Sequence, residues 1–476
     1  MIERSRPTIK NCLLPLGLVG AVYLGSRLGK IIYDLSKHPR LNSVQHPSFV
    51  SSEKDEAFDE LVRAEALILL NKNKRTGHIN GREYVYEPPS EKYIQDWYWD
   101  RAHTAVIGSY LDPSLAKETL LTQAAIFDKL GSHGSQIVYF NHAGNLVERK
   151  LFNRLRGKEG VDQLTQIPLC GLALEIYVKK TGDWETVKQV LPLFDKHYQY
   201  IIDHRYVYKG VDLPVVIHPY ESLDSLPSVD LMYQRKLNNK LLFGALAQGT
   251  LRKARQLNFD AKEITYAQEY SCFDVAFCAF CIRSYNSLAY LYEKLGNSEK
   301  AQYWQERADK SSIDLIGTCF DEENGYFYSR RANGKGELLK VDTAAGLLPL
   351  LNKFELHSDI PLLVIRRLLL YSNFLKDDYF IWTVFQNEKE FFQEEVDPLW
   401  RGPGCSIFEF YTGLGFMENG QTDLARKLWE GQQKRLVNRF KSGHPFPEFF
   451  RPDKTFNDPY MWGILSACNP ADLYQN

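Results

Sequence analysis

The chain has 476 residues, 44% of them hydrophobic and 13% aromatic, which suffices for one large domain or for two or three of average size. Its formal net charge of -1 leaves no basic excess for binding nucleic acid. Eight cysteines show no disulfide framework, and no spacing of His and carboxylate residues indicates a metal site, so we expect no metal and no cofactor.

The N-terminal residues 1–33 combine a basic head with an apolar stretch. The uncharged part, residues 11–25, is short for a membrane span, which needs about 20 residues. An uncleaved signal-anchor, a cleaved signal peptide and an interfacial helix are three alternatives, and the lack of a clear small-x-small cleavage site favours the anchor. We therefore expect membrane association through residues 11–33, in a protein that is membrane-anchored or exported, with an orientation that charge does not decide.

A polar segment with two prolines, residues 34–55, follows and is expected to form a stalk. From residue 56 to residue 476 the apolar residues recur mainly at helical spacing, which predicts one helical domain. The first helix is expected behind Ser51 and Ser52, which are candidate N-caps.

Further helices are marked by their ends. One has Pro168 in its first turn and stops at Gly182, a favoured residue just past a helix C-terminus. Another is stopped by Gly296, and a helix with Trp304 follows at once, so the two are predicted to form a helical hairpin. Cys278 and Cys281 are spaced CxxC in the first helix of this pair, where we interpret them as buried thiols.

Strand signals are few. Asn324-Gly325 and Asn333-Gly334 bracket Tyr326-Phe327-Tyr328, which predicts a small β-hairpin. Paired helices over some 400 residues fit a solenoid or a closed toroid of helical hairpins. No convincing repeat period is present, which favours the toroid. The predicted fold class is therefore all-α, with small β-hairpin excursions and a preceding N-terminal apolar helix.

Two carboxylates, each inside a short signature, carry the strongest functional signal. Asp224 lies in the segment HPYESLDSLPSVD, residues 218–230, and Glu448 lies in PEFFRP, residues 447–452. Two acids cleave an acetal when one donates a proton and the other activates water. The alternative for each is a cap of a helix or turn. An acid working near neutral pH needs a raised pKa, which Glu221 and Asp230 are placed to provide for Asp224.

Six motifs in order resemble those of glycoside hydrolase family 63 and its mannosylglycerate-hydrolase-like relatives. The resemblance covers residues 90–465 and implies an (α/α)6 barrel that hydrolyses α-glycosides with inversion. It also implies that Asp224 is the general acid and Glu448 the general base. The six motifs are Trp97-Tyr98-Trp99-Asp100, Ile137-Val138-Tyr139-Phe140-Asn141, Thr165-Gln166-Ile167-Pro168, the Asp224 segment, Trp400-Arg401-Gly402-Pro403, and Glu448 with Tyr460-Met461-Trp462.

Further side chains are candidates for binding a small carbohydrate or glycoside. Carboxylate and amide groups read adjacent sugar hydroxyls, and flat aromatic rings stack on sugar faces. The competing interpretations are an ion pair of Asp100 with Arg101, a helix cap for Gln166, core packing for the aromatic residues and a structural partner for Arg401. The candidate substrate-binding residues are Trp99, Asp100, Gln166, Tyr220, Glu221, Trp400, Arg401 and Trp462.

The chain also departs from the family pattern at several positions. Ser222 runs directly into Leu223, where the family has an additional Gly, and Ser225 replaces an Asn. Cys405 stands where a Trp is expected, and Glu409 where an Asn is expected. The substrate is accordingly left open among α-glucosides, α-mannosides and glycosyl-glycerates. Alternative functions are a non-catalytic carbohydrate-binding or scaffold protein, a trehalase-like hydrolase and a phosphorylase.

Overall fold

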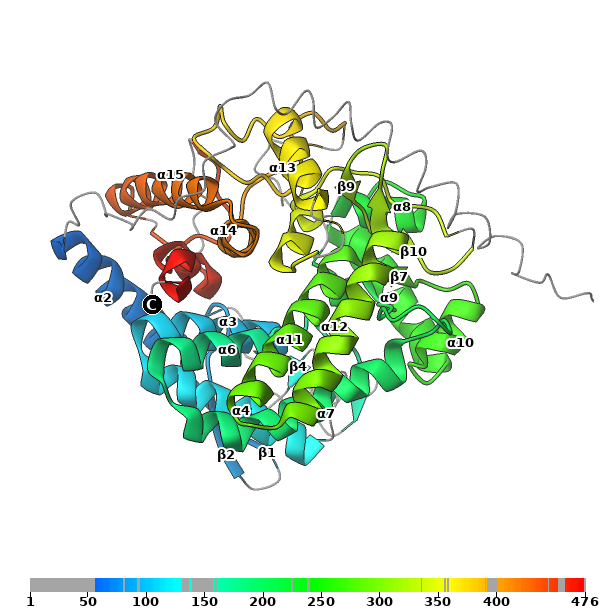
Figure 1. Ribbon diagram of the computed structural model, residues 1–476, viewed down its shortest axis with the longest axis horizontal. Coiled ribbons are helices and arrows are strands. Elements are labelled where there is room, and N and C mark those ends of the chain that lie inside the picture. Colours follow the sequence, from blue (N-terminus) through cyan, green and yellow to red (C-terminus); the bar gives the residue numbers. More distant parts are fainter. Residues whose placement is uncertain are drawn as a thin grey trace, which may run out of the picture. The chain divides into compact units, whose positions relative to one another are not determined.

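Pairs of helices make up most of the fold in the computed structural model (Figure 1). The chain divides into two units, Met1–Lys54 and Asp55–Asn476, and every described residue belongs to the second. The described residues are 56–79, 82–91, 95–130, 137–138, 157–158, 161–223, 226–237, 240–334, 336–354, 357, 359–389, 391, 401–443, 445–452 and 459–474.

Six inner elements contact one another in a closed circle. In chain order each touches the next, and the circle closes because the last touches the first. Helices buried on nearly all sides belong inside a fold, and α11 and α14 are of this kind. The inner elements are α3 (Tyr98–Leu111), α6 (Cys170–Thr181), α11 (Val275–Lys294), the 3₁₀ helix η3 (Ala344–Leu351), α14 (Ser406–Glu418) and the 3₁₀ helix η4 (Met461–Ala467).

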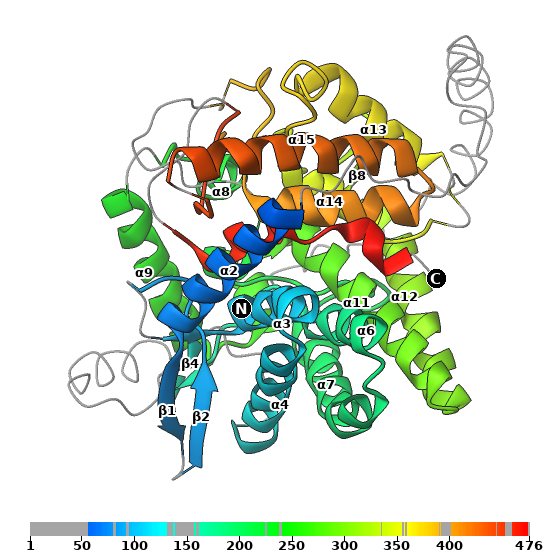
Figure 2. The same cartoon turned by 90° about the vertical axis from the view of Figure 1, so that its left-hand side faces the viewer.

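Each inner element contacts an outer helix, which completes six pairs. Figure 1 shows the pair α11 and α12, and Figure 2 shows α14 and α15 side by side. In five pairs the outer helix follows the inner element, whereas η4 near the C-terminus pairs with α2, the first described helix. This arrangement is an (α/α)6 barrel. In the order of their partners, the outer helices are α4 (Pro113–Leu130), α7 (Trp184–Arg205), α12 (Ser298–Cys319), α13 (Ile360–Tyr371), α15 (Thr422–Lys441) and α2 (Glu56–Asn73).

The helix ends bear out most of the sequence signals. Gly182 adopts a left-handed conformation, with φ of 72°, and ends α6 as expected. Gly296 likewise separates α11 from α12, which form the predicted hairpin. The start of α6 is a correction, because the helix begins at Cys170 and Pro168 lies just before it. Cys278 and Cys281 are fully buried on α11, which confirms that they are core thiols.

The strands are short and antiparallel. The predicted hairpin at Asn324-Gly325 joins β8 (Phe320–Asp321) to β9 (Tyr326–Phe327), and Arg330 beyond it bridges to Leu338 across the second Asn-Gly turn. A hairpin not predicted from the sequence joins β1 (Arg75–Ile79) to β2 (Arg82–Tyr86). The remaining strands are β3 (Asp96–Trp97), β4 (Ile137–Val138), β5 (Gly157–Lys158), β6 (Val161–Asp162), β7 (Cys272–Phe273) and β10 (Arg330–Arg331).

Smaller elements connect the hairpins of the barrel. They include the helices that follow Asp224 in sequence and a short turn of 3₁₀ helix that precedes it. These connectors are η2 (Pro219–Glu221), α8 (Leu226–Tyr233), α9 (Lys240–Gln256) and α10 (Ala261–Tyr266), and the 3₁₀ helix η5 (Pro470–Tyr474) follows the last inner element.

The expected membrane segment lies outside the described residues. Within the part of the chain that the structure describes, no helix combines the length and the apolar character needed to cross a membrane. Residues 1–33 and the stalk at 34–55 are not among those residues, so an N-terminal apolar helix and membrane association through residues 11–33 stay predictions of the sequence.

Candidate active site

The first turn of α3 brings together two of the predicted residues. The backbone N–H of Trp99 has no partner within the helix at this position, and it donates to Oε1 of Gln166 at 3.1 Å. Gln166 comes from the loop before α6, so it caps a helix from a separate segment. This contact supports the helix-cap interpretation for the side-chain oxygen of Gln166 and fixes its side chain at the first turn of α3, beside Trp99.

Asp100 is buried, with 2% of its surface exposed, and it is not paired with Arg101. Arg101 donates instead to Asp96, which excludes the ion pair that was the main alternative for Asp100. Oδ1 of Asp100 has no hydrogen-bond partner among the described residues. Burial first, and then the charges of Asp96 and Glu448, raise the pKa of the Asp100 carboxyl well above its usual range.

Aromatic rings lie beside Asp100. The ring of Trp462, on η4, meets that of Trp99 edge to face at 4.8 Å. Trp462 is buried and also packs on Tyr460 at 4.3 Å, whereas Trp99 is only partly buried. His103, one turn further along α3, packs against Trp99 at 5.5 Å. Trp462 therefore supports Trp99, and Trp99 is the ring of this pair with surface left for a ligand.

Glu448 is half-buried and lies on a bent segment between two isolated β-bridges, which hold the segment at both ends. On one side Phe450 exchanges two backbone hydrogen bonds with Gly404, at 2.8 and 3.1 Å. On the other side the segment packs closely against Gly463. A side chain there would not fit, because a Cβ on Gly463 would lie 2.8 Å from the carbonyl oxygen of Pro447. Burial is the main cause that raises the pKa values of Asp100 and of Cys405, and the charge of Glu448 raises both further. Glu448 thus lies near the starts of both α3 and α14.

Arg401 links the Glu448 region to the segment that follows Asp224. Its Nη2 donates to both oxygens of Asp230 at 2.8 Å and to the carbonyl oxygen of Leu237 at 2.7 Å. Asp230 lies on α8, and Arg401 lies three residues before Gly404. These contacts favour the structural alternative for this nitrogen of Arg401.

The carboxylate of Glu221 is held by hydrogen bonds to other groups of the protein. It is 1% exposed, and its two oxygens accept from both terminal nitrogens of Arg205 and from the backbone N–H groups of Thr165 and Ile217. The bond to Thr165 ties η2 to the loop that carries Gln166. Such a set of partners suits a support of the site better than a sugar contact, and the substrate-binding role of Glu221 stays a prediction.

The expectation that Glu221 and Asp230 raise the pKa of Asp224 stays a prediction, because Asp224 lies outside the described residues. Each of these two carboxylates has an arginine counter-ion, Arg205 or Arg401 respectively. Neither is an uncompensated negative charge, so their effect on neighbouring groups is reduced.

For three of the predicted site residues the structure gives few contacts or none. Tyr220 is half-buried, packs against His218 at 4.8 Å and lies 5.7 Å from Phe243. Asp224 and Trp400 lie outside the described residues, so their positions relative to Glu448 stay predictions.

The residues that depart from the family pattern have separate roles. Cys405 is fully buried at the start of α14 and lies near Glu448. Glu409 is buried one turn later and accepts from Nη2 of Arg435 at 2.6 Å. Glu409 is therefore the buried partner of an outer-helix arginine.

The sequence analysis missed Arg205, and it named Arg401 with a structural partner as one alternative but did not identify that partner. Arg205 precedes Glu221 by 16 residues, and Arg401 follows Asp230 by 171. The only signal in the sequence was that the motifs contain further acidic residues, Glu221 and Asp230, which would need arginine or lysine counter-ions if they were buried. Among the residues that the structure describes, no group of three or more His, Cys, Asp or Glu could hold a metal ion.

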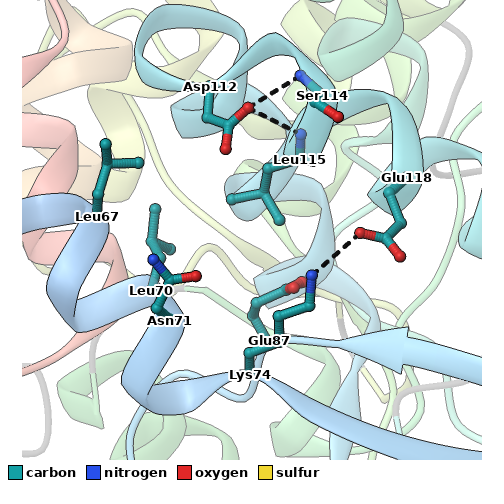
Figure 3. A pocket seen from close by; sticks show the side chains of 9 residues that line it. All are labelled: Leu67, Leu70, Asn71, Lys74, Glu87, Asp112, Ser114, Leu115 and Glu118. Carbon is teal, nitrogen blue, oxygen red and sulfur yellow. Dashed lines mark hydrogen bonds and ion pairs between the residues drawn. The ribbon is translucent and has the colours of Figure 1, made fainter.

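A separate cavity of about 90 Å³ lies between α2, the end of β2 and α4 (Figure 3). Figure 3 shows Lys74 paired with Glu118, and Asp112 accepting from the start of α4. Glu87 also lines this cavity, and none of the predicted site residues does. We therefore distinguish it from the candidate active site.

A family model for the mannosylglycerate hydrolase MGH1-like glycoside hydrolase domain matches residues 93–455. The chain belongs to this family. The matched range of this MGH1-like glycoside hydrolase includes Trp99, Asp100, Gln166 and Glu448 and ends before η4. A search of the curated proteins finds no match.

Solved structures share the fold of this MGH1-like glycoside hydrolase. A family 63 mannosylglycerate hydrolase from Thermus thermophilus, solved with Tris and D-glycerate, is 19% identical, with a TM-score of 0.69 over 87% of this chain and all of its own. Its complex with glucose gives a TM-score of 0.66 at 20% identity, over 87% of this chain and 99% of its own. Neutral trehalase from Saccharomyces cerevisiae is 13% identical, with a TM-score of 0.54 over 93% and 84% of the chains. At these identities the likeness shows the fold alone.

Proposed function

We propose that this MGH1-like glycoside hydrolase cleaves an α-glycosidic bond with inversion, with Asp224 as the general acid and Glu448 as the general base. The observation that carries the proposal is the proximity of Glu448 to Asp100, from opposite ends of the barrel sequence. A half-buried carboxylate then lies near a buried carboxyl with an unpaired oxygen, and that carboxyl follows Trp99 directly in the first turn of α3. This combination suits a pyranose ring with a water beneath its anomeric carbon.

Among the described residues, Asp100 and Trp99 bind the sugar in this proposal, and Glu448 acts as the base. The raised pKa of Asp100 favours its protonated form, which both donates to one sugar oxygen and accepts from a hydroxyl. Trp99 stacks on the apolar face of the ring. Glu448 accepts a proton from water as the water attacks. An inverting enzyme needs room for that water, so we expect the carboxyl groups of Asp224 and Glu448 to lie roughly 6.5–9.5 Å apart.

The substrate is proposed as an α-glucoside, an α-mannoside or a glycosyl-glycerate. The mannosylglycerate hydrolase of similar fold has been solved with glucose and, separately, with Tris and D-glycerate. These ligands support a sugar and a small acidic polyol as the two halves of the substrate. The departure at Cys405, close to Glu448, is where we expect selectivity to differ from that enzyme.

Hydrolysis of a panel of α-glucosides, α-mannosides, trehalose and glycosyl-glycerates tests the proposal. Asp224→Asn and Glu448→Gln should each abolish turnover while sugar binding stays measurable by calorimetry. Glu430→Gln is the matched control, since Glu430 is an exposed acid on α15 paired with Arg426. Near wild-type turnover in either active-site variant would contradict the role of that residue.

The panel also separates the alternatives. A non-catalytic carbohydrate-binding protein would hydrolyse none of the glycosides and would bind sugar equally well with Glu448→Gln. Turnover that depends on inorganic phosphate would indicate a phosphorylase. Exclusive cleavage of trehalose would indicate a trehalase-like hydrolase.

A further inference from the structure

Two successive residues of one loop join Glu221 to the candidate active site. The backbone N–H of Thr165 donates to Oε1 of Glu221 at 2.8 Å. The next residue, Gln166, accepts from the backbone N–H of Trp99 at 3.1 Å through its side-chain oxygen. Thr165, Gln166 and Glu221 are all buried. A path of hydrogen bonds and one peptide unit therefore runs from Glu221 to the first turn of α3, where Asp100 also lies.

The other end of this loop is held by neutral groups. The carbonyl oxygen of Pro168 accepts from the hydroxyl groups of Tyr198 and Ser284, each at 2.8 Å. Tyr198 lies on α7 and Ser284 on α11, and both are fully buried. Gln166 thus lies between an anchor at Pro168 and an anchor at Thr165, and the second of these is the charged one.

The anchor at Thr165 requires a carboxylate. Oε1 of Glu221 accepts from Nη2 of Arg205 at 2.7 Å as well as from Thr165. Oε2 accepts from Nη1 of Arg205 at 3.2 Å and from the backbone N–H of Ile217 at 2.7 Å. An amide nitrogen in place of either oxygen would face two donors, because that group donates and does not accept. Arg205, which is 2% exposed, supplies the counter-charge.

We propose that Glu221, held by Arg205, is a positioning residue that sets Gln166 against the first turn of α3 for sugar binding. The inference deepens the proposed function and rests on it. A buried ion pair is by itself weak evidence of a contribution to stability. This pair also holds backbone N–H groups of two separate segments, and one of them leads directly into the site. The oxygen of Gln166 is occupied by Trp99, which leaves the amide nitrogen to donate to a sugar hydroxyl.

The direct test observes Trp99 without any ligand. The eight tryptophans of the full chain are labelled as 5-fluorotryptophan, and the ¹⁹F NMR resonance of Trp99 is assigned with Trp99→Phe. Glu221→Gln keeps the shape of the side chain but breaks the pattern of four donors. The loop should then move with Gln166, and the Trp99 resonance should shift.

Glu175 provides the matched control. It lies on α6, is 4% exposed and accepts from both terminal nitrogens of Arg283, at 2.8 and 3.1 Å, and from the hydroxyl group of Ser287 at 2.6 Å. These partners are side chains of α11, whereas Glu221 holds backbone groups of the Gln166 loop. Glu175→Gln also takes the main counter-ion from a buried arginine and should lower stability in urea, with the Trp99 resonance unmoved.

Sugar binding gives the second readout, measured by calorimetry with glucose and mannose in the Glu448→Gln background. Gln166→Ala should weaken binding roughly three- to tenfold, the contribution of one hydrogen bond. If Glu221 acts through Gln166, Glu221→Gln should weaken binding by a similar factor, and the double variant by no more than either. Glu175→Gln should leave the affinity unchanged.

Arg205→Lys replaces Glu221→Gln in both tests if that variant does not fold. Lysine keeps the positive charge but lacks the planar fork that holds both oxygens of Glu221. The Trp99 resonance should therefore shift less than in Glu221→Gln, and the loss of sugar affinity should again not add to that of Gln166→Ala.

Three results would overturn the inference. They are an unshifted Trp99 resonance in the folded variant, an equal shift in Glu175→Gln, and additive losses of sugar affinity in the double variant. Neither readout needs turnover. A wild-type protein that binds sugar but cleaves no glycoside, and whose Trp99 responds to Glu221→Gln alone, would overturn the proposed hydrolysis and support the positioning role.

Discussion

Asp100 and Glu448 lie close enough that, after burial and the charge of Asp96, the charge of Glu448 also raises the pKa of Asp100. Asp100 begins α3, near the start of the barrel, and Glu448 precedes η4, near its end. The contact between α3 and η4 closes the inner ring. Closure of the barrel therefore places the two carboxylates next to each other.

The first prediction concerns sugar binding by Asp100. Because its pKa is raised, a protonated Asp100 resembles Asn, and Asp100→Asn should bind sugar within about threefold of the wild-type protein. Asp100→Ala loses two hydrogen bonds to the sugar, each worth about 0.5–1.5 kcal/mol, and should bind about tenfold more weakly. Calorimetry in a Glu448→Gln background isolates binding from turnover. Equal losses in both variants would show that the ionised form binds the sugar.

The second prediction concerns the close approach at Gly463. A Cβ there would lie 2.8 Å from both the carbonyl carbon of Phe446 and the carbonyl oxygen of Pro447, closer than real contacts allow. Gly463→Ala should shift the Glu448 segment and lower kcat by about tenfold or more, because catalysis is sensitive to displacements of about 1 Å. Steady-state kinetics and a melting curve measure both effects.

A matched control for Gly463 is available on an outer helix. Gly317 lies on α12 with open space around the added methyl group. Gly317→Ala should leave kcat unchanged and stabilise the helix by about 0.5–1 kcal/mol. Unaltered kcat in a folded Gly463→Ala protein would show that this approach does not position Glu448.

The third prediction concerns the ion pair of Arg401 with Asp230. Both side chains are largely buried, with 8% and 11% exposed. Asp230→Asn leaves Arg401 without its counter-ion and should lower the free energy of unfolding by about 3 kcal/mol. Urea denaturation measures this change, and a cycle with Arg401→Met should show coupling between the two substitutions. Additive effects would mean that the pair does not hold α8 to the Gly404 loop.

The fourth prediction concerns stability against pH at Glu87. Burial, and to a smaller extent Asp96 and Glu118, raise the pKa of this carboxyl from 4.5 to about 8. Between those pH values the unfolded chain releases a proton that the folded protein keeps, so stability falls as the pH rises from about 4.5 to about 8. Glu87→Gln has no carboxyl to titrate and so lacks this loss. The free energy of unfolding of the variant minus that of the wild-type protein should therefore increase by roughly 4 kcal/mol between pH 4.5 and pH 8. Urea denaturation across this range tests it, and a pH-independent difference would contradict it.

Local chemistry explains which elements were predictable. Gly182, Gly296 and the Asn324-Gly325 turn were identified correctly because each needs a conformation that few residues adopt. The β1–β2 hairpin was missed although Asn80-Gly81, between the two strands in the sequence, is the strongest short hairpin signal.

The residues of the candidate site were predictable from the sequence only where they lie in one of the recognised motifs. Trp99, Asp100, Gln166 and Trp462 were identified in their motifs, and the structure brings them together. Their supports were not predictable, because the partners come from distant segments. Arg435 and Arg439, four residues apart on a helix rich in charge, would suggest a solvated face, yet both are buried. Tertiary packing alone decides this.

The measurement that tests the central claim most directly is ¹H NMR of the sugar released by the wild-type protein from a cleaved α-glycoside, recorded before the anomers equilibrate. If Glu448 activates water on the face opposite the leaving group, the β-anomer appears first. Initial release of the α-anomer would contradict the paired roles of Asp224 and Glu448.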